Sequence, residues 1–452
     1  MSSKPKIIVL DDDPTGSQTV HSCLLLMAWD VATLQLGLKD ESPIFFILTN
    51  TRALPAEVAD ITTREVCHNL KQAIALEGIQ DYLVVSRSDS TLRGHYPIET
   101  DAIAEELGPF DAHFLVPAFF EGGRVTRDSV HYLKVDGQDV PVHNTEFAKD
   151  SVFGYSTSYL PDYVEEKTQG RIAASQVERF LLADLRSGCL NHLMQLQNNV
   201  CVAVDGETQA DLNRFAQDLL NAAAQGKKFL FRSAASILTA LAALPPQPVA
   251  AEAMAQYTRD SKPGAIIVGS HVKKTTQQLN TLLQLPSVVG LEVDVARLQT
   301  RDQPQSSNGG KADDADPYQK LLQETLAQVH QVHAAGKTPV VYTSRKELTF
   351  DDIQTRLAFG IRVSALLMEI EKGLPTDIGF LISKGGITSN DTLSQGLALR
   401  TARLLGQILP GVSIVRTSDN HAQFPNLPVV LFPGNVGDEA GLATAYQRLS
   451  GA

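Results

Sequence analysis

One pattern recurs along the chain and limits the folds that it can adopt: a short apolar run ends in a polar cluster, and an amphipathic segment follows. The runs lie at 7–10, 44–48, 82–85 and 114–116 in the amino half, and at 265–268, 339–342, 379–382, 412–415 and 429–432 in the carboxyl half. Short apolar runs bounded by turn residues are typical of buried strands. Strands that alternate with helices predict parallel sheets with right-handed crossovers. The polar clusters are then expected at one edge of each sheet.

A chain of 452 residues is long for a single core, so more than one domain is expected. The proline-rich stretch at 245–248 and the turn residues at 261–264 are typical of a linker. The predicted parts are an amino-terminal domain at 1–236, a linker at 237–263 and a carboxyl-terminal domain at 264–452. We expect an α/β protein of two domains, each a mainly parallel sheet flanked by helices, with a cleft between them.

Composition limits the classes of binding partner and the cellular compartment that we expect for the protein. Lys and Arg number 39 and Asp and Glu number 51, a net charge of −12, which argues against nucleic acid or an anionic membrane as the main partner. The four cysteines form no CxxC pair and are interpreted as free thiols in a reducing compartment. No stretch reaches the roughly 18 apolar residues of a membrane span. The sequence predicts a cytoplasmic protein, and the polar segment at 125–170, expected to be an irregular flap, leaves a homodimer open.

Three adjacent carboxylates follow the first predicted strand: Asp11, Asp12 and Asp13, with Thr15 and Gly16 behind them. Ligands of open α/β sheets bind at the carboxyl ends of the strands. Like charges repel, so the run indicates a bound Mg²⁺, a sugar hydroxyl or a proton to be moved, although a solvated acidic turn is the structural alternative.

Arginines follow the ends of the other predicted strands in the amino half. They are Arg52, Arg87, Arg93 and Arg124. Guanidinium groups match carboxylates, so these residues could bind an organic acid, or each could pair with a local Asp or Glu. Asp89, beside Arg87 and Arg93, is predicted to have a lowered pKa and to orient a hydroxyl or accept its proton.

Glycine turns mark the carboxyl half. The segment 383–391, with Gly385 and Gly386, is predicted to lie between a strand and a helix at 393–409, and Gly434 and Gly269-Ser270 repeat the device. Glycines let backbone N–H groups approach an anion closely, so three such turns at one edge favour a nucleotide-phosphate site. Walker A, HExxH and GxSxG motifs do not occur in the sequence.

Four segments together resemble the four-carbon acid sugar kinase family: DDDPTG at 11–16, SDSTLRG at 88–94, KGGITS at 384–389 and PGNVGD at 433–438. The resemblance covers nearly the whole chain in the right order. It implies a two-domain α/β protein that uses ATP to phosphorylate tetronates such as threonate, erythronate or 3-oxotetronates. The amino domain is then expected to bind the sugar acid and the carboxyl domain the nucleotide.

The resemblance also implies roles for single residues. The residues expected to face the sugar acid are Asp12, Asp13, Arg52, Asp89, Ser90 and Arg93, with Arg124 added from its place after a strand. The residues expected to face ATP with Mg²⁺ are Ser270, Gly385, Gly386, Ile387, Thr388 and Gly434. The sequence departs from the family pattern at Arg87, where lysine is usual, at His95, where asparagine is usual, and at Ile387, where an acid that could help to hold metal is usual. The metal ligands are left unassigned, with Asp391 and Asp438 as candidates.

The kinase hypothesis assigns a mechanism. Asp13 or Asp89 aligns, and could deprotonate, the terminal hydroxyl, while arginines hold the acid's carboxylate. A rival hypothesis takes Asp11 and Asp13 as the nucleophile and the acid/base of a haloacid-dehalogenase-type phosphatase, because the D-x-D-x-T spacing matches. A third takes the protein as a sugar-acid and nucleotide sensor without turnover.

Overall fold

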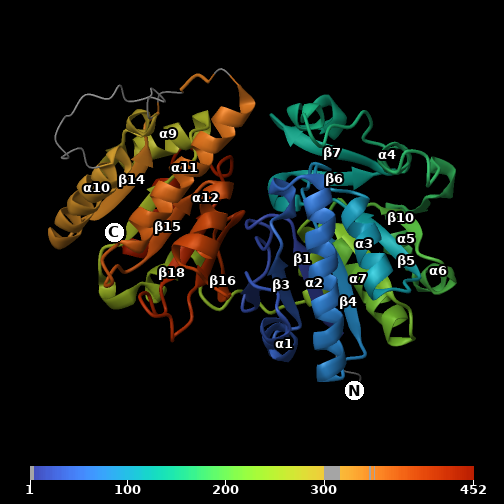
Figure 1. The fold of residues 1–452 in the computed structure, drawn as a ribbon. Coiled ribbons are helices and arrows are strands. Elements are labelled where there is room, and N and C mark those ends of the chain that lie inside the picture. The colour runs from blue at the N-terminus through green and yellow to red at the C-terminus, as the bar shows by residue number, and fades with distance from the viewer. Residues whose placement is uncertain (1–4, 300–315, 346–347, 351, 452) are drawn as a thin grey trace, which may run out of the picture. The chain divides into compact units, whose positions relative to one another are not determined.

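A computed structural model gives the structure of the protein (Figure 1). It describes residues 5–299, 316–345, 348–350 and 352–451. The chain divides into two compact units, which we call the amino unit (1–247 and 400–407) and the carboxyl unit (248–399 and 408–452). Both alternate strands and helices, so the prediction of an α/β fold on mainly parallel sheets is confirmed. Among the described residues no helix is both long and apolar enough to cross a bilayer.

The sheet of the amino unit has the strand order β16-β2-β3-β1-β4-β11-β5-β10-β9. Its strands are β1 (Lys6–Asp11), β2 (Leu24–Leu26), β3 (Ile44–Leu48), β4 (Tyr82–Arg87), β5 (Ala112–Val116), β9 (Glu178–Phe180), β10 (Val200–Val204), β11 (Phe229–Ser233) and β16 (Thr401–Leu409). All neighbours are parallel except β16 and β2. The loops after β3, β1, β4, β11 and β5 therefore emerge at the same edge.

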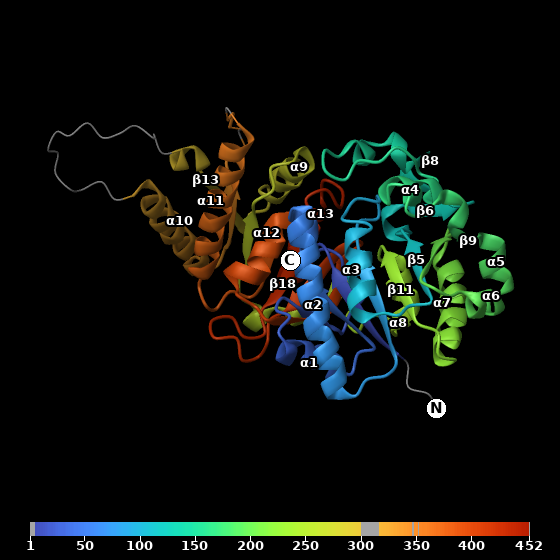
Figure 2. The same ribbon diagram turned by 45° about the vertical axis from the view of Figure 1, so that its right-hand side comes forward.

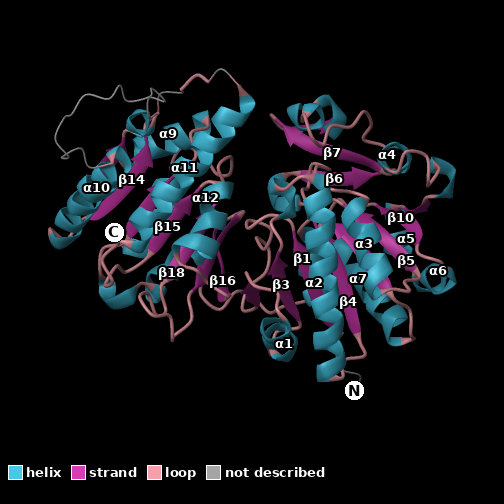
Figure 3. Ribbon diagram, viewed as in Figure 1, coloured by secondary structure: helices cyan, strands magenta, loops and turns pink. Residues whose placement is uncertain are grey.

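Helices cover both faces of this sheet, as a parallel sheet requires (Figures 2 and 3). They are α1 (Val31–Lys39), α2 (Ala56–Glu77), α3 (Ile98–Leu107), α4 (Leu160–Lys167), α5 (Leu182–Ser187), α6 (Leu190–Gln195), α7 (Gln209–Ala224) and α8 (Ser236–Ala242). On one face, Leu70 of α2 packs in a core with Phe45 and Leu230. On the other face, Phe215 of α7 packs edge-on against Phe114, with ring centroids 5.6 Å apart. Alternate residues of each strand therefore serve separate cores.

The segment 125–170 is more regular than predicted. It contains most of a three-stranded antiparallel sheet of β6 (Arg124–Arg127), β7 (Val130–Val135) and β8 (Gln138–Pro141), followed by α4. The prediction of an irregular flap is therefore wrong. The strand was not recognised in the sequence because one of the inward positions of β7 is occupied by a polar residue. His131 is fully buried there, so the apolar alternation that indicates a strand is interrupted.

The sheet of the carboxyl unit has the strand order β13-β14-β12-β15-β18-β17, and only β17 is antiparallel to its neighbour. Its strands are β12 (Ala265–Val268), β13 (Val288–Val293), β14 (Thr338–Thr343), β15 (Leu381–Lys384), β17 (Val412–Arg416) and β18 (Pro428–Phe432). Its α-helices are α9 (Lys273–Leu282), α10 (Pro317–Ala334), α11 (Ile353–Lys372), α12 (Gly386–Asp391) and α13 (Gly441–Ser450). The loops after β12, β15 and β18 emerge side by side.

The helix predicted at 393–409 is wrong. A π-helical turn (Thr392–Gly396) extends α12, and strand β16 then runs antiparallel to β2. Leucine and alanine favour helices, which concealed a period of two: Ala402, Leu404 and Ile408 are buried on β16. Tertiary pairing therefore overrides the local helix propensity in this segment.

Candidate active site

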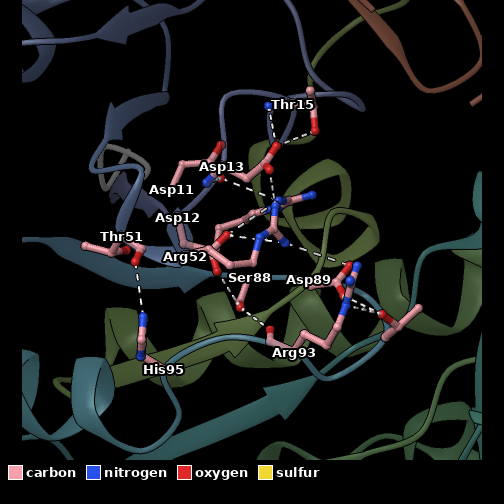
Figure 4. A network of polar contacts seen from close by, with 12 residues as sticks. Asp11, Asp12, Asp13, Thr15, Thr51, Arg52, Ser88, Asp89, Arg93 and His95 are labelled. Carbon is pink, nitrogen blue, oxygen red and sulfur yellow. Dashed lines mark hydrogen bonds and ion pairs between the residues drawn. The ribbon is translucent and has the colours of Figure 1, made fainter. Parts of the chain in front are cut away.

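In the amino unit the predicted polar clusters meet at the carboxyl edge of the sheet, around one guanidinium group (Figure 4). Arg52, which follows β3, forms an ion pair with Asp13. Its Nη1 atom lies 3.7 Å from Asp12 Oδ1 and 3.8 Å from Asp89 Oδ1. Four of the predicted site residues, from the loops after β1, β3 and β4, are thus brought together.

Asp89 is an ionised carboxylate held by two arginines. Arg93 Nε donates to Asp89 Oδ2 at 2.7 Å, and the Thr91 hydroxyl donates to the same oxygen. Burial alone would raise the pKa of Asp89, but the charges of Arg52 and Arg93 and these hydrogen bonds lower it to about 2. Arg87, which the sequence placed beside Asp89, instead lies 3.5 Å from Asp11. The predicted lowering of the pKa is present, with Arg52 rather than Arg87 as its main source.

Asp12 and Asp13 are fixed by the loops around them. Ser88 Oγ lies 2.7 Å from Asp12 Oδ2, and the backbone N–H of Thr15 donates to Asp13 at 2.8 Å. Burial raises the pKa of Asp13, but Arg52 and the hydrogen bonds from Thr15 outweigh it, so the pKa falls below its ordinary value. Asp13 is therefore a second ionised carboxylate beside Arg52.

Asp11 is buried beneath the loop that carries Asp13 and Gly16. Its side chain is 1% exposed, and its Oδ2 atom has no hydrogen-bond partner among the described residues. A Cβ atom on Gly16 would lie 2.0 Å from Asp11 Oδ1, so the loop backbone covers the carboxyl group. Burial raises the pKa of Asp11 to about 8. A covered carboxyl group with a raised pKa is poorly suited to nucleophilic attack.

Arg124 differs from Arg52, Arg87 and Arg93 because no carboxylate lies within ion-pair distance of it in the described part of the chain. Its Nη1 donates to the carbonyl of Gly122, its guanidinium lies 5.9 Å from the ring centroid of Phe119, and its buried Nε has no hydrogen-bond partner among the described residues. Burial lowers its pKa, and the charge of Asp89 opposes this effect. Local pairing therefore accounts for Arg52, Arg87 and Arg93, and leaves Arg124 as a cation near Asp89.

Ser90 and three residues that the sequence analysis missed make buried polar contacts next to the site. The carbonyl of Ser90 lies 2.8 Å from Nε2 of the buried His131, which comes from β7. Arg232, near the carboxyl end of β11, forms an ion pair with Glu99 of α3 at 2.6 Å and donates a hydrogen bond to Ser86 Oγ at 2.8 Å. An arginine near the end of the apolar run FLFRS was the signal available for Arg232. Nothing in the sequence indicated Glu99 or His131.

In the carboxyl unit the three glycine turns meet as predicted. Ser270 follows β12, Gly385 follows β15 and Gly434 follows β18, and these strands are adjacent and parallel. Gly385 has φ +130°, and a Cβ atom on it would lie 2.9 Å from Thr388 Oγ1, whereas one on Gly434 would lie 3.1 Å from Ser270 Oγ. Side chains at these glycines would fill the space between the loops. The side chain of Ile387, which follows Gly386 in the sequence, is 73% exposed.

A cavity of about 490 Å³ opens beside these turns. Ser270, Gly385, Gly386, Ile387 and Thr388 line part of it. The lining also includes an apolar group of side chains, from Val295, Leu348, Phe350, Phe359, Val363 and Leu367, and polar side chains such as those of Thr343, Arg356 and Ser364. The sequence analysis missed Arg345, which also lines the cavity and donates to the carbonyl of Ser270 at 2.6 Å. An apolar pocket beside glycine turns can hold a planar base and its phosphates.

The chain supplies no ready-made metal site in the residues that the structure describes, because no three His, Cys, Asp or Glu side chains there could hold one ion. Asp391 accepts hydrogen bonds from Ser364 and from Gln395. Asp438 accepts one from the backbone N–H of Ala440. Both candidate carboxylates are thus already engaged.

Two family models match this chain, one in its amino-terminal part and one in its carboxyl-terminal part. A family model described as the sugar-binding N-terminal domain matches residues 7–241, and one described as the nucleotide-binding C-terminal domain matches residues 265–442. The chain is 24% identical to the D-erythronate kinase of Heliobacterium modesticaldum over 98% of this chain and 97% of that protein. The chain belongs to the four-carbon acid sugar kinase family.

The chain is also similar to a second curated kinase and, in fold, to two solved structures. The D-threonate kinase of Bordetella bronchiseptica is 29% identical over 35% of this chain and 38% of that protein. The fold matches a Salmonella typhimurium LT2 protein provisionally described as a tRNA synthase, with TM-score 0.69, 20% identity and coverage of 97% of this chain and 98% of that one. It also matches a Haemophilus influenzae protein of the DUF1537 family, with TM-score 0.63, 17% identity and coverage of 98% and 100%.

Proposed function

We propose that this protein transfers the terminal phosphoryl group of ATP to a hydroxyl of a four-carbon sugar acid such as erythronate, threonate or a 3-oxotetronate. The relatives named D-erythronate kinase and D-threonate kinase support this reaction class. The observation that carries the proposal is that one unit presents a carboxylate with a strongly lowered pKa, Asp89, and near it the guanidinium of Arg124, which has no ion-pair partner among the described residues. A sugar acid presents a carboxylate for the cation and hydroxyls for the anion.

On the sugar-acid side, Arg124 binds the carboxylate of the substrate, and Asp89 accepts a hydrogen bond from the reacting hydroxyl. A carboxylate with a pKa of about 2 is a weak base. Its role is therefore to align the hydroxyl, and it takes the proton late, when bond formation has made that proton acidic. This suits phosphoryl transfer, whose loose transition state requires alignment and charge neutralisation more than a strong base. Asp13 and Asp12, held by Arg52, extend the polar wall, and Ser90 and Arg93 fix its geometry.

On the nucleotide side, the apolar wall of the cavity takes the base of ATP. Ser270, Gly385, Gly386, Thr388 and Gly434 take the phosphates through backbone N–H groups and hydroxyls. The exposed side chain of Ile387 packs against the nucleotide at the rim. Mg²⁺ usually keeps several waters and is bound through substrate phosphates with few protein ligands. The engaged state of Asp391 and Asp438 fits an ion that arrives with ATP.

The experiment is an ATP-dependent phosphorylation assay of the full chain against a panel of four- to six-carbon sugar acids, with ADP release and ³¹P NMR of the product as readouts. We expect turnover with at least one tetronate and a product phosphorylated at a terminal hydroxyl. A protein that binds ATP and the acid without any turnover would be a sensor. Phosphate release from a sugar phosphate, with label trapped on Asp11, would support the phosphatase, which the covered position of Asp11 disfavours.

A further inference from the structure

The loop at 433–438, which follows β18, has its carbonyl groups bound from one side. Lys384 Nζ donates to the carbonyl of Pro433 at 2.5 Å and lies 3.4 Å from that of Gly434. Thr275 Oγ1 of α9 donates to the same Gly434 carbonyl at 3.0 Å. Gln278 Nε2, one turn later on α9, donates to the carbonyls of Val436 and Asp438 at 2.9 and 2.7 Å.

Lys384 is an unusual residue to find as a buried hydrogen-bond donor to a loop. It lies at the end of β15 with 0% of its surface exposed, and no carboxylate lies within ion-pair distance of it among the described residues. Its ammonium lies 4.0 Å from the ring centroid of Phe432. Burial, together with the charge of Lys274, lowers the pKa of Lys384 to about 7. A buried cation without a counter-charge is costly, so its place beneath a loop calls for a reason.

Peptide geometry explains how the donors beneath the loop orient its backbone N–H groups. In a trans peptide the C=O group and the following N–H group point in opposite directions. The donors that draw the carbonyls of Pro433 and Gly434 inward therefore turn the N–H groups of Gly434 and Asn435 outward. Neither N–H has an acceptor among the described residues. Successive outward N–H groups in a turn form an anion-binding concavity.

We infer that Lys384 is a positioning residue that holds the loop at 433–438 so that the N–H groups of Gly434 and Asn435 bind the phosphates of the nucleotide. The inference rests on the proposed function, since it takes the carboxyl unit as the ATP site. It assigns Lys384 a role beneath the phosphates rather than in contact with the base. When the amine is protonated, its charge also acts on the phosphates through the loop, because no carboxylate of the described residues lies within ion-pair distance to cancel it.

The test compares affinities for ATP, ADP and adenosine, measured by titration calorimetry on the full chain. In Lys384→Met we expect the ATP and ADP affinities to fall about tenfold or more, as the loss of charge-assisted contacts predicts. The adenosine affinity should stay within about twofold, because adenosine occupies only the apolar cavity. Lys320→Met, which removes an exposed lysine from α10, serves as the matched control and should change none of the three.

A second variant covers the case in which Lys384→Met fails to fold. Thr275→Val keeps the side-chain shape and removes a donor to the same Gly434 carbonyl, so ATP affinity should fall by a smaller factor while adenosine affinity is unchanged. Equal losses for ATP and adenosine, or no loss in either variant, would overturn the inference. If the unaltered protein binds neither ATP nor adenosine, the proposed function itself fails, which is a distinguishable result.

Discussion

Arg52 Nη1 lies 3.8 Å from Asp89 Oδ1, and this ion pair joins the loop after β3 to the loop after β4. Arg93 binds the other carboxylate oxygen of Asp89, so both oxygens are oriented by guanidinium groups. A carboxylate fixed in this way keeps its charge at any pH at which the protein would be assayed, since its pKa is about 2. The pair therefore makes Asp89 an aligning group rather than a titrating one.

The first prediction concerns Asp89→Asn. We expect kcat to fall by about 10²-fold or more, because the amide aligns the hydroxyl less well and cannot take its proton. ATP affinity should be unchanged. The control is Asp150→Asn, which removes a carboxylate 3.6 Å from Arg93 without touching Asp89. Steady-state kinetics with the best tetronate measure both, and a kcat loss in the control equal to that in Asp89→Asn would remove Asp89 from the mechanism.

The second prediction concerns Arg124→Gln. The KM for the sugar acid should rise by about ten- to a hundredfold, as expected for loss of one charge-assisted pair with a carboxylate. The KM for ATP should not change. Arg127→Gln is the control, because Arg127 is already paired with Asp139 and Glu207. An unchanged KM for the acid in Arg124→Gln would show that the substrate carboxylate is bound elsewhere.

The third prediction concerns Gly385. With φ at +130°, Gly385→Ala should cost about 1–3 kcal/mol of stability and weaken ATP binding. Gly386→Ala is the neighbouring control, because a Cβ atom there meets nothing within 4 Å, and its melting temperature should match that of the unaltered protein. Thermal unfolding of both variants decides the matter, and equal melting temperatures would contradict the strained conformation.

The fourth prediction concerns pH and Glu371, a fully buried residue of α11 whose Oε2 accepts a hydrogen bond from Thr392. Burial raises its pKa from 4.5 to about 8. The folded state therefore binds this proton more tightly than the unfolded state. The resulting stabilisation is complete below pH 4.5, declines as the pH rises, and is lost above about pH 8.

Urea unfolding at about pH 5 and about pH 9 tests this dependence. Glu371→Gln should reduce the difference in unfolding free energy between the two conditions, because glutamine stays neutral at both. The exposed Glu369→Gln on the same helix should leave the difference unchanged. A pH dependence that is identical in Glu371→Gln and in the unaltered protein would mean that Glu371 does not titrate in this range.

The sequence predicted most strands because their signal is local. The runs at 44–48 and 265–268 form strands over those same residues. It also predicted which loops share an edge, since parallel order follows from alternation. The strand β16 was missed because its partner, β2, lies more than 370 residues earlier in the chain and no local pattern announces the pairing.

The sequence could place the arginines of the site but not their partners. Arg52, Arg93 and Arg124 look alike as residues that follow strands, yet only the folded structure separates the first two, which carboxylates neutralise, from the third. The apolar lining of the pocket could not be predicted from the sequence either, because Val295, Phe350 and Phe359 come from segments that carry no nucleotide motif. Charge balance and cavities are properties of long-range packing.

Strand β16 has a consequence for dissecting this protein. Thr401 and Arg403 pair with Leu26 and Leu24, and Arg403 forms an ion pair with Asp40, so the amino unit takes one strand from sequence that follows the glycine turns at 269–270 and 385–386. A gene fragment that stopped in the linker would encode that unit with the edge of β2 bare, which is a template for aggregation. We therefore expect that independent expression of the amino unit requires residues 400–407 to be grafted back, and that a single cut does not yield two separately folding proteins.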